Sequence, residues 1–128
     1  MNEKVNLRTP LARVKGLGAS GQGSHHWWVQ RLTAIALVPL SLWFAFSIVG
    51  HIDDDYVTVL AWISSPGVAV MLLLFLGFMF FHAQLGLQVV IEDYVHNETV
   101  KMAALLAVKA LALLAGVASI FAVLRIAL

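Results

Sequence analysis

Three long apolar segments, separated by short polar stretches, dominate the chain. They run over residues 28–50, 67–91 and 102–124. At about 1.5 Å per residue, helices of this length can cross the roughly 30 Å hydrocarbon core of a bilayer, with some tilt for the longest. The pattern therefore predicts an all-α membrane protein, with three transmembrane helices in a single domain over residues 28–128.

Residues 1–27 differ from the rest in being polar, glycine-rich and basic. The basic side chains are Lys4, Arg8, Arg13 and Lys15, against one acid, Glu3. A basic stretch before an apolar one could be a signal peptide. This stretch is long for an n-region, however, and the apolar run from Leu32 to Gly50 exceeds the usual h-region of about 7–15 residues. We therefore expect an uncleaved, basic N-terminal arm on the cytoplasmic side.

The positions of the basic residues predict the orientation of the helices. Five of the eight Lys and Arg residues lie at or before Arg31, whereas the Asp53–Asp55 loop contains none. Cytoplasmic segments of membrane proteins are enriched in Lys and Arg. The N-terminus and the Glu92–Lys101 turn are therefore predicted to be cytoplasmic, and the Asp53–Asp55 loop and the C-terminus periplasmic.

Composition narrows the functional class. The chain is 61% hydrophobic and 12% charged, whereas soluble domains are about 45–50% apolar and about 25% charged. Too little polar sequence remains for a soluble catalytic domain, and we expect the lipid bilayer, not a nucleic acid, as a partner. The absence of cysteine excludes disulfides, thiolate metal sites and protein-held iron–sulfur clusters from this chain.

His82 lies inside the second apolar segment, about 15 Å along the helix from Glu92. An ionisable ring at this depth costs free energy unless it has a partner, so it is a candidate functional residue. Three roles are open: a hydrogen bond to a carbonyl or hydroxyl on another helix, a proton relay, or an axial ligand of haem through the neutral imidazole. Gly86, one turn further on the same face, leaves room for a flat macrocycle, although small residues also serve helix packing.

A haem with two axial ligands would need a second histidine that this chain does not offer at the depth of His82. The other four histidines lie outside the apolar segments: His25, His26, His51 and His96. The second ligand would therefore come from another chain. We expect the three helices to pack with a partner anchor subunit in the membrane.

Several polar residues lie at or near the cytoplasmic ends of the spans. For Lys109 and Tyr94 the pattern alone favours ordinary roles, a cation reaching the headgroups and an aromatic anchor at the interface. The functional alternative is that Tyr94 donates a hydrogen bond to a carbonyl of a lipophilic ligand, with Asp93 in a proton path. For Arg31, headgroup contact and a ligand role remain equally open.

Two segments together resemble a known family. They are Arg31-Leu32-Thr33-Ala34-Ile35-Ala36 and the stretch from His82 to Val95, with His82-Ala83, Gly86, Gln88-Val89 and Asp93-Tyr94. They are similar to the smaller hydrophobic anchor subunit of succinate dehydrogenase (succinate:ubiquinone oxidoreductase, complex II). The resemblance spans essentially the whole chain, and the spacing from His to Asp-Tyr is its most specific part. Arg8-Thr9-Pro10-Leu11, Gly16-Leu17-Gly18 and His26-Trp27-Trp28 resemble the alphaproteobacterial branch.

The resemblance implies roles for individual residues. His82 corresponds to an axial ligand of haem b, a group shared with the larger cytochrome b anchor subunit. Tyr94 corresponds to the tyrosine that hydrogen-bonds ubiquinone, and Asp93 to the acid before it. Arg31 and His25 correspond to positions near the haem propionates, although enteric relatives have His-Asp where this chain has His25-His26.

The resemblance also implies a division of labour within a complex. Succinate oxidation and the flavin belong to a flavoprotein subunit, and the clusters to an iron–sulfur subunit. This chain is then a multi-pass anchor in the bacterial inner membrane that shares haem b and completes the ubiquinone site. The complex links the tricarboxylic acid cycle to electron transport. This chain is one of its non-catalytic subunits and is not an enzyme by itself. The alternative is a cofactor-free structural anchor or a small transporter subunit. A transporter is expected to carry carboxylates within its spans, and these spans have none.

Overall fold

The computed structural model describes residues 9–14 and 22–128. All regular structure in these residues is helical. The helices are α1 (Pro10–Val14), α2 (Gln22–Gly50), α3 (Tyr56–Ser64), α4 (Pro66–Tyr94) and α5 (Glu98–Ala127). More than half of the basic arm expected over residues 1–27 lies outside the described residues, and residues 22–27 form the first turns of α2.

Three of these helices, α2, α4 and α5, are long and apolar enough to cross a membrane. The all-helical fold with three transmembrane helices is therefore confirmed. Each helix is longer than the apolar segment that predicted it, because hydropathy marks only the part in hydrocarbon. The helical hydrogen bonding continues through the polar residues at the ends, such as Glu92 to Tyr94 in α4.

The short helix α3 was not expected. Its nine residues follow the acidic loop, in a stretch whose turn-forming residues indicated an irregular connection. Asp55 caps the helix by accepting a hydrogen bond from the backbone N–H of Thr58 at 2.9 Å, as N-terminal acids commonly do. Hydrogen bonds from Thr58, first from its side chain and then from its backbone, hold the pKa of the Asp55 carboxyl below its ordinary value. Pro66 then begins α4, where its missing N–H costs nothing.

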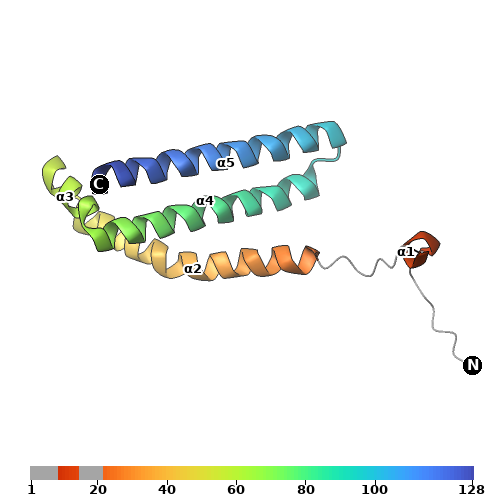
Figure 1. Cartoon of the computed structure of the whole chain (residues 1–128), viewed down its shortest axis with the longest axis horizontal. Helices are drawn as coiled ribbons and strands as arrows, with labels where there is room; N and C mark the ends of the chain where they lie inside the picture. Colours follow the sequence, from red (N-terminus) through yellow and green to blue (C-terminus); the bar gives the residue numbers. More distant parts are fainter. Residues whose placement is uncertain (1–8, 15–21) are drawn as a thin grey trace, which may run out of the picture.

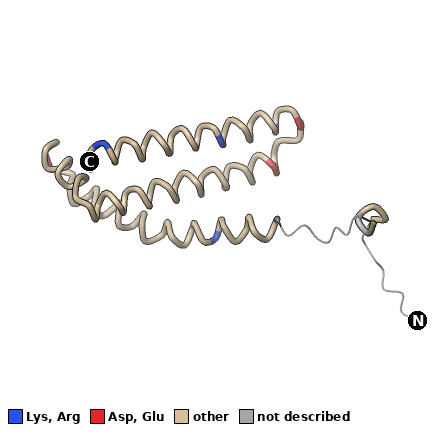
Figure 2. The backbone as a smooth tube through the Cα atoms, in the orientation of Figure 1, with Lys and Arg blue, Asp and Glu red and all other residues tan. Residues whose placement is uncertain are grey.

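The three long helices lie side by side in a single row with α4 in the middle (Figure 1). α4 packs against α2 on one side and α5 on the other, and within the described residues α2 and α5 do not contact each other. A row one helix thick encloses few side chains. Large apolar residues such as Phe46, Leu106 and Phe121 remain exposed on it. Charged residues are sparse along the long helices (Figure 2).

Most of the enclosed apolar residues lie toward the end of the row that holds Gly50, α3 and the C-terminus, which we call the Asp55 end. Ala69 and Leu72 of α4 and Val123 of α5 form its centre. Phe44 stacks on Phe75 with ring centroids 4.7 Å apart, which joins α2 to α4. Trp43 of α2 lies against Trp62 of α3, and Trp62 also meets His51. The opposite end, which holds Gln22, Tyr94 and Glu98, is the Tyr94 end.

Candidate functional site

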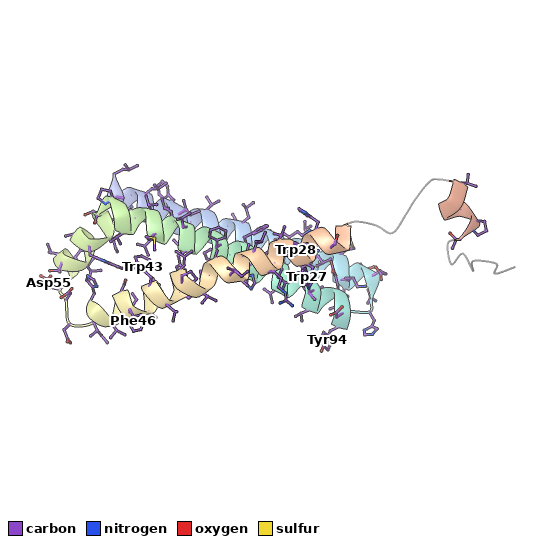
Figure 3. The ribbon with its side chains drawn as sticks, turned by 90° about the horizontal axis from the view of Figure 1, so that it is seen from below. Trp27, Trp28, Trp43, Phe46, Asp55 and Tyr94 are labelled. Atoms are coloured by element: carbon purple, nitrogen blue, oxygen red, sulfur yellow. The ribbon has the colours of Figure 1, made fainter. Side chains whose placement is uncertain are left out.

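The residues expected to carry function lie in the half of the row toward the Tyr94 end. Figure 3 shows Trp27, Trp28 and Tyr94 at this end, opposite Asp55. In an all-helical membrane protein, side chains are presented at membrane depth by helices, which leave no unpaired backbone groups exposed to lipid. The position of each candidate residue is therefore set by its register on α2 or α4.

His82 lies on the side of α4 that faces α2. Its Nδ1 atom is 2.9 Å from Oγ1 of Thr33, which is 49 residues away in the sequence. Thr33 Oγ1 also donates a hydrogen bond to the backbone carbonyl of Gln30 at 2.9 Å. Thr33 is 4% exposed and is the one buried polar residue in the described part of the chain. The expected alternative of a hydrogen bond to a hydroxyl on another helix is therefore confirmed for one ring nitrogen of His82.

The other ring nitrogen of His82, Nε2, has no hydrogen-bond partner among the described residues. It is also not enclosed, because His26 Nε2 is the only enclosed side-chain nitrogen or oxygen in those residues without a partner. Gly86, one turn along α4, borders open space, since a Cβ atom added there would meet nothing within 4 Å. Nε2 is therefore accessible at the surface of this chain, near room for a ligand or another chain.

The donor set can be compared with what a metal or a haem requires. The described residues contain no group of three or more His, Cys, Asp or Glu side chains that could hold a metal ion. A haem needs no such group, because the porphyrin supplies the equatorial nitrogens and the protein only the axial ligands. His82, with Nδ1 hydrogen-bonded and Nε2 accessible, fits one axial position. The residues present therefore fit a haem whose second ligand comes from another chain.

Arg31 lies two residues before Thr33 and thus at nearly the same depth. At about 100° per residue, however, it lies about 200° around α2 from Thr33. Its guanidinium sits over the Trp27 ring, with Cζ 4.7 Å from the ring centroid, an arrangement that favours a cation. The structure therefore brings Arg31 level with His82 but not into contact with it. His25, in the first turn of α2, is exposed.

Asp93 and Tyr94 end α4 at the aqueous rim. The Tyr94 side chain is 77% exposed and projects away from the helices (Figure 3). Neither its hydroxyl nor the Asp93 carboxylate has a partner in the described part of the chain. Tyr94 is twelve residues from His82, which is about 18 Å along the helix. The two therefore belong to separate sites within this chain.

The sequence interpretation missed a hydrogen-bonded ladder along α4. Gln84 Nε2 donates to Gln88 Oε1 at 3.2 Å, and Gln88 Nε2 donates to Glu92 Oε1 at 2.8 Å. An ionised carboxylate can only accept hydrogen bonds, so Gln88 must donate to Glu92. Its amide oxygen is then left to accept from Gln84, and the orientation of both side-chain amides is set. The spacing of four residues on a helix is a signal that could have predicted these pairs.

A groove of about 340 Å³ lies along the contact between α4 and α5. Its lining is apolar except for Gln84 and Lys109, whose positions in the two helices are level with each other. Lys109 is exposed on α5. The groove and the His82 site therefore lie on opposite sides of α4.

Comparison with known proteins tests the family resemblance. The family model of the succinate dehydrogenase/fumarate reductase transmembrane subunit matches residues 5–118. The chain is 37% identical over 119 residues to the succinate dehydrogenase hydrophobic membrane anchor subunit of Rickettsia bellii, covering 92% of this chain and 94% of that protein. It is 29% identical over 100 residues to the protein of the same name in Paracoccus denitrificans, covering 78% of each chain.

A relative from another organism carries a similar name. The succinate dehydrogenase membrane anchor subunit of Reclinomonas americana is 29% identical over 94 residues, covering 71% of this chain and 78% of that protein. No solved structure matches the chain. The family match and three apolar helices also confirm a multi-pass membrane protein. The chain belongs to the succinate dehydrogenase/fumarate reductase transmembrane subunit family.

Proposed function

We propose that the chain is the smaller anchor subunit of a bacterial inner-membrane succinate:ubiquinone oxidoreductase, that it shares haem b with the larger anchor, and that it contributes to the ubiquinone site. Family membership supports the anchor role. The observation that carries the haem part is the state of His82. One ring nitrogen is bonded to Thr33 at membrane depth, and the other is accessible without a partner.

A second membrane chain is needed because His82 is one ligand and an imidazole from elsewhere must complete the pair. We assign this role to the cytochrome b anchor subunit. The iron–sulfur and flavoprotein subunits then bind at the Tyr94 end, which the excess of basic residues near the N-terminus orients toward the cytoplasm.

When bound, haem b supplies one-electron redox chemistry. Within this chain, His82 would bind the haem iron through Nε2, and Thr33 would hold the ring through its contact with Nδ1. Arg31 lies at nearly the same depth and carries the positive charge that suits a propionate, with His25 nearer the aqueous end of α2. Gly86 leaves the neighbouring surface free of a side chain.

Tyr94 and Asp93 form this chain's part of the quinone site. The Tyr94 hydroxyl is exposed and free of partners within the described residues, so it can donate a hydrogen bond to a ubiquinone carbonyl. Asp93 is the adjacent carboxylate through which a proton can reach the reduced quinone from the aqueous side. Electrons arrive from the iron–sulfur subunit, since this chain has no cysteine to hold a cluster.

The second candidate is a cofactor-free structural anchor. The observation that favours it is the His82–Thr33 hydrogen bond, because such a bond alone can stabilise a polar side chain between helices. The two candidates differ in one respect: a purely structural histidine has no use for an accessible Nε2.

A visible spectrum of the purified complex with His82→Ala tests the proposal. We expect the haem b band to be lost while the subunits still purify together and succinate still reduces an artificial acceptor. His96→Ala is the matched control, because His96 is exposed beyond the end of α4. An unchanged band in His82→Ala would contradict the haem role and leave the structural anchor.

A further inference from the structure

The Thr33 hydroxyl has two polar neighbours and one hydrogen. The Gln30 carbonyl, 2.9 Å away, can only accept a hydrogen bond. The other neighbour is His82 Nδ1, also at 2.9 Å. Both contacts are hydrogen bonds at once only when the Thr33 hydrogen goes to Gln30 and a lone pair of Oγ1 faces Nδ1. For that contact to be a hydrogen bond, Nδ1 must carry the proton.

A proton on Nδ1 determines the state of the rest of the ring. A neutral imidazole has one N–H, so Nε2 then carries a lone pair. Nε2 is also the nitrogen that is accessible and without a partner among the described residues. The hydrogen bond and the accessibility are independent observations, and both point to Nε2 as the atom that binds a ligand.

We propose that Thr33 is a positioning residue that fixes the tautomer and ring orientation of His82, so that Nε2 is presented to the haem iron as a strong donor. The inference rests on the proposed haem role of His82. In metal sites, histidine ligands usually donate their second N–H to such a partner, which raises the basicity of the ligating nitrogen.

The surroundings of Thr33 suit this role. Its side chain is 4% exposed, so lipid and water do not compete for the hydroxyl. Threonine in a helix has few rotamers, and its bond to the carbonyl one turn back selects among them. The Gln30–Thr33–His82 chain therefore connects the backbone of α2 to the ring on α4 through two short hydrogen bonds.

The opposite tautomer makes the opposite prediction. If Thr33 donated to Nδ1, Nε2 would carry the proton and could not bind iron in that state. Thr33 would then oppose haem binding, and its removal would release the ring. Substitutions that remove only the hydroxyl therefore distinguish the two arrangements.

The experiment uses the purified complex with Thr33→Val, which keeps the shape but removes the hydroxyl, and with Thr33→Ser, which keeps the hydroxyl. Haem retention is measured by transfer to excess apomyoglobin, and the haem midpoint potential by spectroscopic redox titration. We expect Thr33→Val to hold haem about 10- to 100-fold more weakly. Its potential should shift positive, because a weaker donor stabilises ferric iron less. Thr33→Ser should match the unmodified complex on both measurements.

Several results would overturn the inference. Retention and potential in Thr33→Val equal to those of the unmodified complex would show that the hydroxyl does not act on the iron ligand, and tighter retention would indicate the opposite tautomer. Thr33→Ala is measured in parallel. Failure of both the Val and the Ala variants to assemble would show that the Thr33 hydroxyl is needed to hold the helices together and not to position an iron ligand. His82→Ala separates this inference from the proposed function. A haem band retained in His82→Ala contradicts both. If that band is lost and Thr33→Val still behaves like the unmodified complex, only the role of Thr33 is contradicted.

Discussion

The two ends of the helix row are built differently. At the Asp55 end, aromatic rings from α2, α3 and α4 meet, and Ala69, Leu72 and Val123 are enclosed. At the Tyr94 end no short helix comparable to α3 packs on the row within the described residues. There α4 ends in exposed polar residues, and in the described part of the chain Arg31 is paired only with the ring of Trp27 in its own helix. Packing within the chain is thus concentrated at one end, and side chains available to ligands and partners at the other.

This difference indicates how a small membrane subunit can fold stably by itself and still leave side chains free to bind ligands and other subunits. Lipid tails solvate apolar side chains well, so helices associate through close packing and hydrogen bonds instead of the hydrophobic effect. The Asp55 end supplies the close packing, and the Thr33–His82 bond supplies a hydrogen bond nearer the Tyr94 end. The comparison predicts that substitutions at the two ends act on different properties.

The largest expected effect is on stability at the Asp55 end. Phe75 is 8% exposed and stacks on Phe44. Phe75→Ala should lower the free energy of unfolding of the detergent-solubilised chain by about 3 kcal/mol, the lower end of the range for a buried Phe. Lipid or detergent tails would replace part of the lost contact. Phe46→Ala is the control, because Phe46 is 74% exposed, and an equal loss there would contradict the comparison.

At the Tyr94 end we expect an effect on activity rather than on stability. Tyr94→Phe should lower quinone reduction by the complex roughly two- to tenfold, the equivalent of one hydrogen bond of about 0.5–1.5 kcal/mol. Succinate oxidation with an artificial acceptor should not change. Tyr56→Phe is a matched control, since Tyr56 is equally exposed but lies at the Asp55 end. A similar loss in both assays would indicate damage to assembly instead.

The glutamine ladder on α4 should contribute less. Gln88→Leu removes both of its hydrogen bonds, each worth about 0.2–0.5 kcal/mol for a pair four residues apart on one helix, whereas Gln84→Leu removes one. Unfolding in detergent should show a loss of about 0.4–1 kcal/mol for Gln88→Leu and about half as much for Gln84→Leu. Equal effects of the two substitutions would contradict the ladder.

The smallest expected effect concerns the cap of α3 and its dependence on pH. Because the pKa of Asp55 lies below its ordinary value near 3.8, the charged cap stabilises the helix above that value. This contribution is lost as the pH falls through the lower, folded-state pKa. The hydrogen-exchange protection factor of the Thr58 amide should therefore stay constant at higher pH and fall only in strong acid. Asp55→Asn should remove this dependence, and Asp53→Asn should not.

The sequence predicted the helical elements more completely than their contacts. An apolar run must become a helix in lipid, because no other open structure pairs every backbone group within one segment. The three spans followed from that rule alone. The short helix α3 did not, since nine residues beside an acidic loop carry no comparable requirement. His82 was identified from its depth alone, because an ionisable residue in hydrocarbon needs a reason to be there.

Residues that act through long-range contacts were harder to find. The Gln84–Gln88–Glu92 ladder is local, and its spacing could have predicted it. Thr33 could not be found in this way, because its partner lies 49 positions further along. Arg31 was expected near the same site as His82, and register on α2 placed it level with the ring but on another side.

The sequence by itself determined that this protein crosses the membrane three times, which family it resembles, and which residues are the candidates for its chemistry. These conclusions depend on hydropathy, residue type and local spacing, which can be read from the amino-acid sequence. Only the tertiary structure decided that Thr33 meets His82, that Nε2 and not Nδ1 is accessible, and that packing is concentrated at the Asp55 end. These depend on how α2 and α4 are rotated and aligned against each other, and that alignment is fixed by many side-chain contacts at once.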